Sequence, residues 1–447
     1  MKYKTFIFND YNFNADSKTL YLHYSYDNEL FFEETIQFPS ERPLGEKELK
    51  TLDNIFKYIH IACGISYYKL FLVDDIKINT FLLNEEQANF FNEFYRKGLG
   101  EFSFKNNITD IDKRINFPYS GNVQNKASDV NLVKKILIPI GGGKDSITTL
   151  EIIKTIKNVN DILTCSVGTS KCIDDEIKMS GCASFHPIRT ISANLLELNK
   201  RLEEIGGYNG HVPISGILAF VMSACAVIYG FDTILMSNER SANVGNVEFN
   251  GNVVNHQWSK SFEFEKSINS FFKKYLLKNL TYISFLRPLY EINIVKLFSK
   301  LKQYHNVFRS CNKNFKINNR IENWCCECDK CRFIFLMLAV FLTKNELVKI
   351  FGKDLLNDEE QLQGFMELCG LDGHKPFDCV GEVKECVFAI LKVDNSFKND
   401  YVVKKLQPLL EDVDVNEIKK DLFSLGDEHL LSEDLIKALT NYINKQD

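Results

Sequence analysis

The sequence predicts an α/β protein built around a doubly wound parallel sheet. Three observations lead to this expectation. The first forty residues alternate apolar and polar side chains, residues 132–239 alternate short apolar runs with helical patterns, and the chain beyond Asn246 becomes helical and polar. Strands that alternate with helices favour a parallel sheet with helices on both faces. We expect four regions, at residues 1–130, 131–305, 306–392 and 393–447.

The composition sets broad limits on function. Of the 447 residues, 45% are hydrophobic and 25% are charged, which is ordinary for a globular protein and excludes a disordered chain. The net charge of −5 offers no overall attraction for nucleic acid or an anionic membrane, so neither is expected as a partner. The N-terminal residues contain no apolar segment of signal-peptide length. We therefore expect a cytoplasmic protein whose 13 cysteines stay reduced.

The N-terminal region reads as a small α+β domain. The stretches TFIFNDYNF, TLYLHYSY and LFFEETIQF alternate with a period of two and predict an antiparallel meander. A helix is expected at about Glu46 to Cys63, followed by the segment GISYYKLF and an amphipathic helix in NEEQANFFNEFYRKGL. The polar stretch from Asn106 to Asn131 marks the predicted boundary.

The run from Ile214 to Gly230 has no charged residue and approaches the shortest length that spans a bilayer. It is rich in small residues and lacks a flanking basic cluster. A helix that is apolar all round also suits the centre of a large α/β core. We expect a buried helix from Pro213 to Tyr229.

A glycine-rich loop joins the apolar run KKILIPI to the helical pattern ITTLEIIKTI. It consists of Gly141, Gly142, Gly143, Lys144, Asp145 and Ser146. Glycines let backbone N–H groups approach phosphates, and the following helix N-terminus adds partial positive charge. Lys144 supplies a cation, and Asp145 is a candidate magnesium ligand or helix cap. A plain glycine turn without a ligand is the alternative.

Two familiar phosphate motifs do not match this loop. A Walker A loop fails because Asp145 follows Lys144 directly, and a dinucleotide fingerprint fails because Ser146 stands at its last glycine position. The loop resembles the SGGxDS loop of the N-type ATP pyrophosphatases, with Gly141 in place of serine. That resemblance implies cleavage of ATP between the α- and β-phosphates.

A dense group of cysteines lies in the third region. Cys325, Cys328 and Cys331 form a C-x-x-C-x-x-C run, and Cys311 precedes it. Four thiolates complete a closed tetrahedral zinc site, which is structural and does not activate water. A ferredoxin-like cluster is less suitable because the C-x-x-x-C-P ending is absent. Cys326 need not bind metal, and the alternative is a group of reduced, buried cysteines.

Several segments together resemble one family, the ATP-dependent UDP-N-acetylmuramoyl-L-alanyl-L-glutamate epimerases, or MurL family. They are IHIACGISYYKLF, IPIGGGKDS, GYNGHVPIS, ILMSNERSANVGN, NHQWSKSFEFE, WCCECDKCRF and GHKPFDCVGEV. The resemblance extends to about Lys392. A loop followed by a zinc clamp is also similar to the 7-cyano-7-deazaguanine synthases, but those proteins are shorter and lack the N-terminal region.

The MurL resemblance implies conversion of a terminal L-glutamate of a nucleotide-sugar peptide to D-glutamate, with ATP consumed to AMP and diphosphate and magnesium as a cofactor. The chemistry is reasonable because adenylation removes the carboxylate charge and makes the α-proton acidic enough for a general base. Two other functions stay open. One is a different ATP-dependent carboxylate-activating enzyme, either one that needs an amine or ammonia or an epimerase that acts on the terminal residue of another peptide. The other is a nucleotide-binding protein without turnover. The oligomeric state stays open.

The same resemblance and the predicted sheet nominate further site residues. Ser237 and Asn238 follow a predicted strand, at the edge where open α/β sheets bind ligands, and Arg189 is a second nucleotide candidate. Arg240 suits a phosphate or a substrate carboxylate, unless it forms a surface ion pair.

The base is not identified by sequence. Lys144, Asp145 and His211 are the catalytic candidates, and His211 is the first choice for acid–base work because histidine titrates near neutrality. A loop histidine that caps a helix or contacts nucleotide is the alternative. His256 and His374 are runners-up. The remaining substrate candidates are Tyr67, Tyr68 and Lys69, and the tyrosines suit a core equally well.

Overall fold

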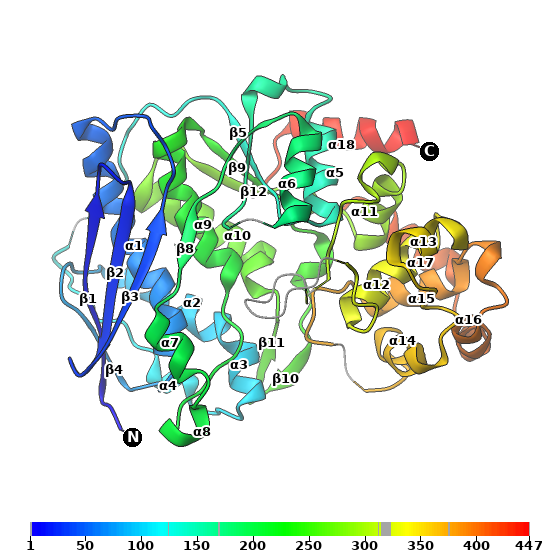
Figure 1. Ribbon diagram of the computed structural model, residues 1–447, viewed down its shortest axis with the longest axis horizontal. Coiled ribbons are helices and arrows are strands. Elements are labelled where there is room, and N and C mark those ends of the chain that lie inside the picture. The colour runs from blue at the N-terminus through cyan, green and yellow to red at the C-terminus, as the bar shows by residue number, and fades with distance from the viewer. Residues whose placement is uncertain are drawn as a thin grey trace.

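The computed structural model describes residues 2–123, 125–168, 170–311, 313, 323–373 and 376–446. Along the long axis, the N-terminal five-stranded sheet comes first and the second five-stranded sheet follows it (Figure 1). The helices of the C-terminal third lie beyond both sheets (Figure 1). Within the described residues, no helix is both long enough and apolar enough to span a membrane. His374 lies outside the described residues.

The N-terminal sheet has the strand order β4-β1-β2-β3-β8. Its strands are β1 Thr5–Asn14, β2 Thr19–Tyr26, β3 Leu30–Gln37, β4 Asp75–Ile78 and β8 Ile188–Thr190. The first three form the predicted antiparallel meander. Strand β8 comes from much later in the chain and pairs with the edge of β3, which no local sequence signal indicated.

Helix α1 is longer than the sequence predicted. It spans Glu46–Tyr68, so it continues through the segment beyond Cys63. A Cβ atom on Gly64 would lie 2.3 Å from the ring of Phe8, so glycine lets the helix pack tightly against the sheet. This packing outweighs the low helix propensity of glycine. The other helices before the parallel sheet are α2 Glu85–Gly98, α3 Gly100–Lys105 and α4 Ile111–Arg114.

The second sheet is entirely parallel, with the order β12-β9-β5-β6-β7. Its strands are β5 Ile136–Pro139, β6 Ile162–Cys165, β7 Ala183–Phe185, β9 Thr233–Met236 and β12 Thr281–Ser284. The chain adds strands first on one side of β5 and then on the other, as a doubly wound sheet requires. A separate hairpin pairs β10 Val247–Phe249 with β11 Asn252–Val254.

Alternate residues of the parallel strands face two different hydrophobic clusters. Leu137, Leu163 and Ile234 join a cluster that also holds α1, α9 and the N-terminal sheet. Ile138, Ile162 and Leu235 join the opposite cluster, which includes residues of α5 and α11. The helices around this sheet are α5 Lys144–Ile153, α6 Lys171–Ser180, α7 Ala193–Leu198, α8 Leu202–Ile205, α9 Ile214–Cys225, α10 Phe262–Phe271 and α11 Glu291–Phe298.

The uncharged segment forms a buried helix, as predicted. Helix α9 is followed by one π-helical turn over Ala226–Gly230, and α9 packs against α1 inside the molecule. Gly216 lets α9 lie close to α2, because a Cβ atom there would lie 2.5 Å from the ring of Phe94.

The C-terminal third is helical and builds its own hydrophobic cluster. Its helices are α12 Asp329–Leu338, α13 Lys344–Phe351, α14 Leu362–Leu368, α15 Val383–Lys392, α16 Tyr401–Leu406, α17 Val415–Leu422 and α18 Glu433–Gln446. Helix α18 returns to the parallel sheet, where Leu439 is buried in the cluster beside α5 (Figure 1). The division into four regions remains a prediction.

Candidate active site

The glycine loop lies at the carboxyl end of β5, where the strand order changes direction. The segment Ser237–Glu239 leaves the neighbouring strand β9 at the same edge. Ligands of open α/β sheets bind at this kind of edge because the loops on the two sides diverge there. The topology therefore brings together two segments that are far apart in the chain.

The loop has a backbone that only glycine adopts easily at one position. Gly142 has φ +82°, and the next residue, Gly143, would place a Cβ atom 3.0 Å from Oγ of Ser310. The amide of Arg309 donates to the carbonyl of Gly142 over 2.6 Å. No side chain caps the N-terminus of α5, so its first amides keep the geometry that binds anions.

Three carboxylates meet beside the loop and form what we call the carboxylate cluster. Asp145, Glu239 and Glu291 each place an oxygen within 4.8 Å of the other two. Burial, together with the charges of Glu291 and Asp145, raises the pKa of Glu239 to about 7. Three oxygen donors of this kind fit a magnesium ion, which prefers carboxylate ligands and substrate phosphates.

Lysines balance much of this negative charge. Lys144 is fully buried and its ammonium forms ion pairs with Asp145 and Glu291. Nζ of Lys330 lies 3.7 Å from Glu291. Lys144 was expected to be a cation for phosphates, and in this structure its charge holds two of the three carboxylates in place.

Some polar atoms at this edge have no partner among the described residues. They include the buried Oγ of Ser237 and Nε of Arg309. Asn238 is different, because its amide nitrogen donates to Ser284 over 3.0 Å. Buried polar groups are normally hydrogen-bonded, so such orphans fit a site that receives a polar ligand.

A second group, which we call the imidazole cluster, contains Glu101, His211 and His256. The ring centroids of the two histidines lie 4.6 Å apart, and Nδ1 of each ring faces the same carboxylate oxygen of Glu101. His211 keeps 3.3 Å from that oxygen, and His256 makes the closer contact. The structure thus brings together the first-choice histidine and one of its runners-up.

The two histidines differ in charge. Burial and the nearby charge of His256 lower the pKa of His211 to about 4. Burial alone would also lower the pKa of His256, but its hydrogen bonds to Cys379 and Glu101 outweigh burial and raise it to about 9. At neutral pH, His256 is therefore the cation and His211 the neutral ring.

Cys379 connects the imidazole cluster to the carboxylate cluster. Nζ of Lys260 donates to its Sγ over 3.3 Å, and Lys330 donates to its backbone carbonyl. Burial opposes a thiolate here, but the charges of Lys260 and His256 and the hydrogen bond from His256 lower the pKa of Cys379 to about 6. The same Lys260 feels the charge of Glu239, so the two clusters share one electrostatic environment.

A cavity of about 850 Å³ opens beside the imidazole cluster. Gly100 and Asn255, which line it, directly neighbour Glu101 and His256 in the chain. Arg96, Lys266 and Trp258 also face this space. Its volume suits a substrate of drug size or larger.

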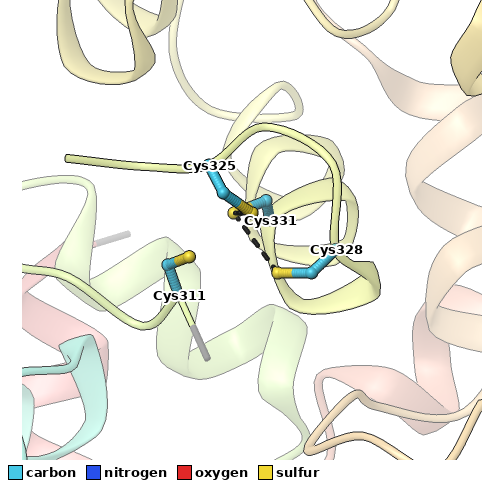
Figure 2. Close-up of side chains that lie close together, drawn as sticks. All are labelled: Cys311, Cys325, Cys328 and Cys331. Carbon is cyan, nitrogen blue, oxygen red and sulfur yellow. Dashed lines mark hydrogen bonds between the residues drawn. The ribbon is translucent and has the colours of Figure 1, made fainter. Parts of the chain in front are cut away.

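The four cysteines of the predicted zinc site lie together, and we call them the thiol cluster. Figure 2 shows Cys325, Cys328 and Cys331 around one point, with Cys311 facing them from the preceding segment. The Sγ atom of Cys331 lies 3.6 Å from that of Cys325 and 3.5 Å from that of Cys328. Tetrahedral zinc with Zn–S bonds of about 2.3 Å needs sulfur separations of about 3.8 Å, so the thiols fit this metal.

The thiol cluster also lies next to the glycine loop. Arg309 and Ser310, which contact Gly142 and Gly143, immediately precede Cys311. Lys330, which contacts Glu291, immediately precedes Cys331. A metal that joined these two segments would hold both sides of the carboxylate cluster in register.

Comparisons with known proteins agree on one family. Residues 1–285 match the MurL N-terminal domain, and residues 307–421 match the MurL C-terminal domain. The UDP-N-acetyl-alpha-D-muramoyl-L-alanyl-L-glutamate epimerase of Xanthomonas oryzae is 32% identical over 93% of this chain and 92% of its own length. Epimerases of the same name from Micromonospora and Salinispora tropica are each 34% identical, over 92% and 86% of this chain and 92% and 84% of theirs. This chain belongs to the MurL family. The resemblance found in the sequence is confirmed.

Some predicted site residues of this MurL family member lie elsewhere. Arg189 belongs to β8 in the N-terminal sheet, where its buried guanidinium binds Glu34 at 2.6 Å and 3.1 Å and Ser66 at 3.2 Å. Tyr67 and Tyr68 are fully buried on α1, so both are core residues here. These three residues contribute to packing, and we leave them out of the site proposed below.

Two other candidates support neighbouring segments. Nζ of Lys69 donates to the side chain of Asn209 and to the carbonyl of Gly210, directly before His211. Arg240 stacks on the ring of Tyr290 at 4.4 Å and lies 4.0 Å from Asp421. Lys69 thus supports the loop of the imidazole cluster, whereas Arg240 contacts the C-terminal helical region.

Sequence reasoning missed six charged or nucleophilic groups of the site. They are Glu101, Glu239, Lys260, Glu291, Lys330 and Cys379. Cys379 and Lys260 stand inside segments that carry the MurL resemblance, GHKPFDCVGEV and NHQWSKSFEFE, which was an available signal. Glu101 and Glu291 sit in ordinary helical sequence, and no local pattern marks them.

Proposed function

We propose that this chain inverts the terminal L-glutamate of UDP-MurNAc-L-Ala-L-Glu to D-glutamate in an ATP-dependent reaction. Membership of the MurL family supports the epimerisation, because the curated relatives carry that activity in their names. ATP dependence rests on the meeting of the glycine loop and the carboxylate cluster at the edge where β5 and β9 end. A cytoplasmic location fits a nucleotide-sugar substrate.

Activation of the substrate carboxylate comes first in this proposal. The glutamate oxygen attacks the α-phosphate of ATP and diphosphate leaves, which gives an acyl-adenylate. Amides of residues 141–146 and the α5 N-terminus face the phosphates, and Ser237, directly after β9, donates to them. Bound magnesium supplies positive charge for the departing diphosphate, and Asp145, Glu239 and Glu291 are the residues that would hold it.

Inversion follows activation. The acyl-adenylate no longer carries the carboxylate charge, so its α-proton is acidic enough to leave to a general base. Reprotonation from the other face inverts the centre, and hydrolysis then releases AMP. The cavity beside Glu101 and His256 gives the peptide and its sugar nucleotide room close to the base.

We also propose that the thiol cluster binds zinc as a structural ion. All four ligands would come from protein, so the metal would have no open position for water or substrate. It would fix the segment before Cys311 to the start of α12, and through them Ser310 and Lys330 beside the loop.

The proposal is tested with purified protein, UDP-MurNAc-L-Ala-L-Glu, ATP and magnesium. Glutamate released by acid hydrolysis is analysed on a chiral column, and AMP and diphosphate are measured in the same sample. We expect D-glutamate only when both ATP and magnesium are present. Folded protein that yields no D-glutamate contradicts the proposal.

The two other functions give different results in the same assay. A carboxylate-activating enzyme of another kind forms AMP only when an amine or ammonia is added. A nucleotide-binding protein binds ATP without forming AMP.

A further inference from the structure

Two positively charged side chains, which come from different elements, lie beside the thiol of Cys379. Lys260 approaches it from the turn before α10, and His256 from the segment that follows β11. Lys330 at the start of α12 binds its carbonyl and adds a third positive charge. A neutral thiol gains little from three cations, whereas a thiolate gains a great deal.

His256 is in turn held by Glu101. The carboxylate binds Nδ1 of His256, and Lys105 binds the other oxygen of Glu101 one helical turn away. This gives a chain of contacts from Glu101 through His256 to Cys379. A carboxylate that orients an imidazole beside a nucleophile or base is a recurrent arrangement in enzymes.

We propose that Cys379 is the catalytic base that takes the α-proton of the activated glutamyl residue, with His256 and Glu101 as positioning residues. The inference rests on the proposed function and names a residue that neither the fold nor the family match assigns. Its place is suitable, because Lys330 contacts both the carbonyl of Cys379 and the carboxylate of Glu291. Lys260, which donates to Sγ of Cys379, also feels the charge of Glu239.

Other groups in the same region suit the role less well. His211 has a pKa of about 4, so its ring is a weak base. Burial lowers the pKa of Lys69 to about 8, which leaves it protonated at neutral pH, and its ammonium is bound by the loop before His211. Cys379, with a pKa of about 6, is mainly unprotonated at neutral pH. A base whose pKa lies this close to neutrality is favourable for general-base catalysis.

The step balances without an added oxidant or reductant. The Cα–H bond breaks, its proton goes to Sγ of Cys379, and its electron pair moves towards the acyl carbonyl oxygen. A proton from a water-exchangeable acid then forms a new Cα–H bond on the other face, and the electron pair returns to carbon. One proton leaves and one returns, so in D2O the product carries deuterium at Cα.

The test separates proton transfer from activation. Full-length Cys379→Ala and Cys379→Ser variants are incubated with UDP-MurNAc-L-Ala-L-Glu and MgATP. Activation is followed by exchange of labelled diphosphate into ATP, and proton transfer by mass spectrometry of deuterium gained from D2O. Cys182→Ser is the matched control, because Cys182 follows α6 and belongs to the hydrophobic cluster beside α5, where its thiol contacts the carbonyl of Ser180.

We expect both Cys379 variants to keep substrate-dependent diphosphate exchange and to lose deuterium incorporation by about 10²–10⁴-fold, the usual contribution of a general base. The Cys182 variant should keep both partial reactions. A Cys379 variant that incorporates deuterium at the wild-type rate overturns the proposal. A variant with wild-type melting temperature that loses both partial reactions also overturns it, because Cys379 would then serve activation.

A second measurement uses the wild-type protein, in case the variants fold poorly. Iodoacetamide is added, and labelling of the Cys379 peptide is measured beside the two partial reactions. Deuterium incorporation should fall in proportion to Cys379 labelling while diphosphate exchange persists. Labelled protein that still incorporates deuterium contradicts the role of Cys379. Wild-type protein without any substrate-dependent diphosphate exchange contradicts the proposed function itself, which is a different result.

Discussion

Nζ of Lys260 lies 3.3 Å from Sγ of Cys379, although the two residues are 119 positions apart in the chain. One belongs to the segment before α10, and the other to the segment before α15. The contact joins the region around the parallel sheet to the C-terminal helical region, beside the imidazole and carboxylate clusters. Its electrostatic consequence is a thiol that ionises near neutral pH.

Removing the charge of Lys260 should raise the pKa of Cys379 towards the ordinary thiol value. The thiolate exists above its pKa and is lost as pH falls through about 6 in the native protein. In Lys260→Met this loss should occur at higher pH, by at least one unit. The measurement is the rate of iodoacetamide labelling of the Cys379 peptide as a function of pH. Lys278→Met, which removes an exposed lysine, should leave the midpoint where it is, and an unshifted Lys260→Met would contradict the charge coupling.

Gly142 should not tolerate a side chain. Its φ of +82° costs an L-residue about 1–2 kcal/mol, and relief of that strain would move the amides of the loop. We expect Gly142→Ala to slow substrate-dependent diphosphate exchange by about tenfold or more, the factor that 1.4 kcal/mol represents. Gly121→Ala serves as control, because that glycine faces open space. Equal rates in the two variants would remove Gly142 from the phosphate site.

The thiol cluster should hold about one zinc ion per chain, as four thiolates complete a tetrahedral site. Cys328→Ser should lower the zinc content measured by plasma mass spectrometry and lower the melting temperature. Cys326→Ser is a close control, because the Sγ of Cys326 turns away to the carbonyl of Phe351 at 3.4 Å and is outside the thiol cluster. Zinc that stays bound in Cys328→Ser, or is lost in Cys326→Ser, would contradict this ligand set.

Arg189 should matter for stability and not for nucleotide binding. Its removal leaves Glu34 buried without its cation, which costs about 3–5 kcal/mol. Urea unfolding of Arg189→Met should show this loss, and the double variant Arg189→Met/Glu34→Met should recover most of it because no charge is then left unpaired. The KM for ATP of the double variant should equal that of the native protein. A KM raised tenfold would return Arg189 to the nucleotide site.

Local patterns were sufficient for much of the fold. The alternation in residues 5–37 predicted the meander, and strand and helix signals on both sides of Gly141–Ser146 predicted where β5 and α5 lie. These features depend on neighbours along the chain, through side-chain periodicity and the backbone freedom of glycine. The predicted end of α1 was wrong because the true end depends on contacts between Gly64 and Phe8, which are distant in sequence.

The candidate site was predictable to a smaller extent. The glycine loop and the four cysteines have characteristic spacings, and the structure brings the thiols of Cys311, Cys325, Cys328 and Cys331 together. Arg189 lies in a strand that pairs with β3 instead of joining the parallel sheet, and no local pattern indicated this position. No spacing rule could have paired Cys379 with Lys260 or His256.

The sequence by itself determined the family, the parallel sheet, the loop at its edge and the cysteine group, because each is encoded in short segments or in overall similarity. Only the tertiary structure decided which charges share a buried space. Lys144 came to balance Glu291, and Cys379 came to lie between Lys260 and His256. The physical reason is that pKa values depend on burial and on charges within a few ångströms, and folding sets both.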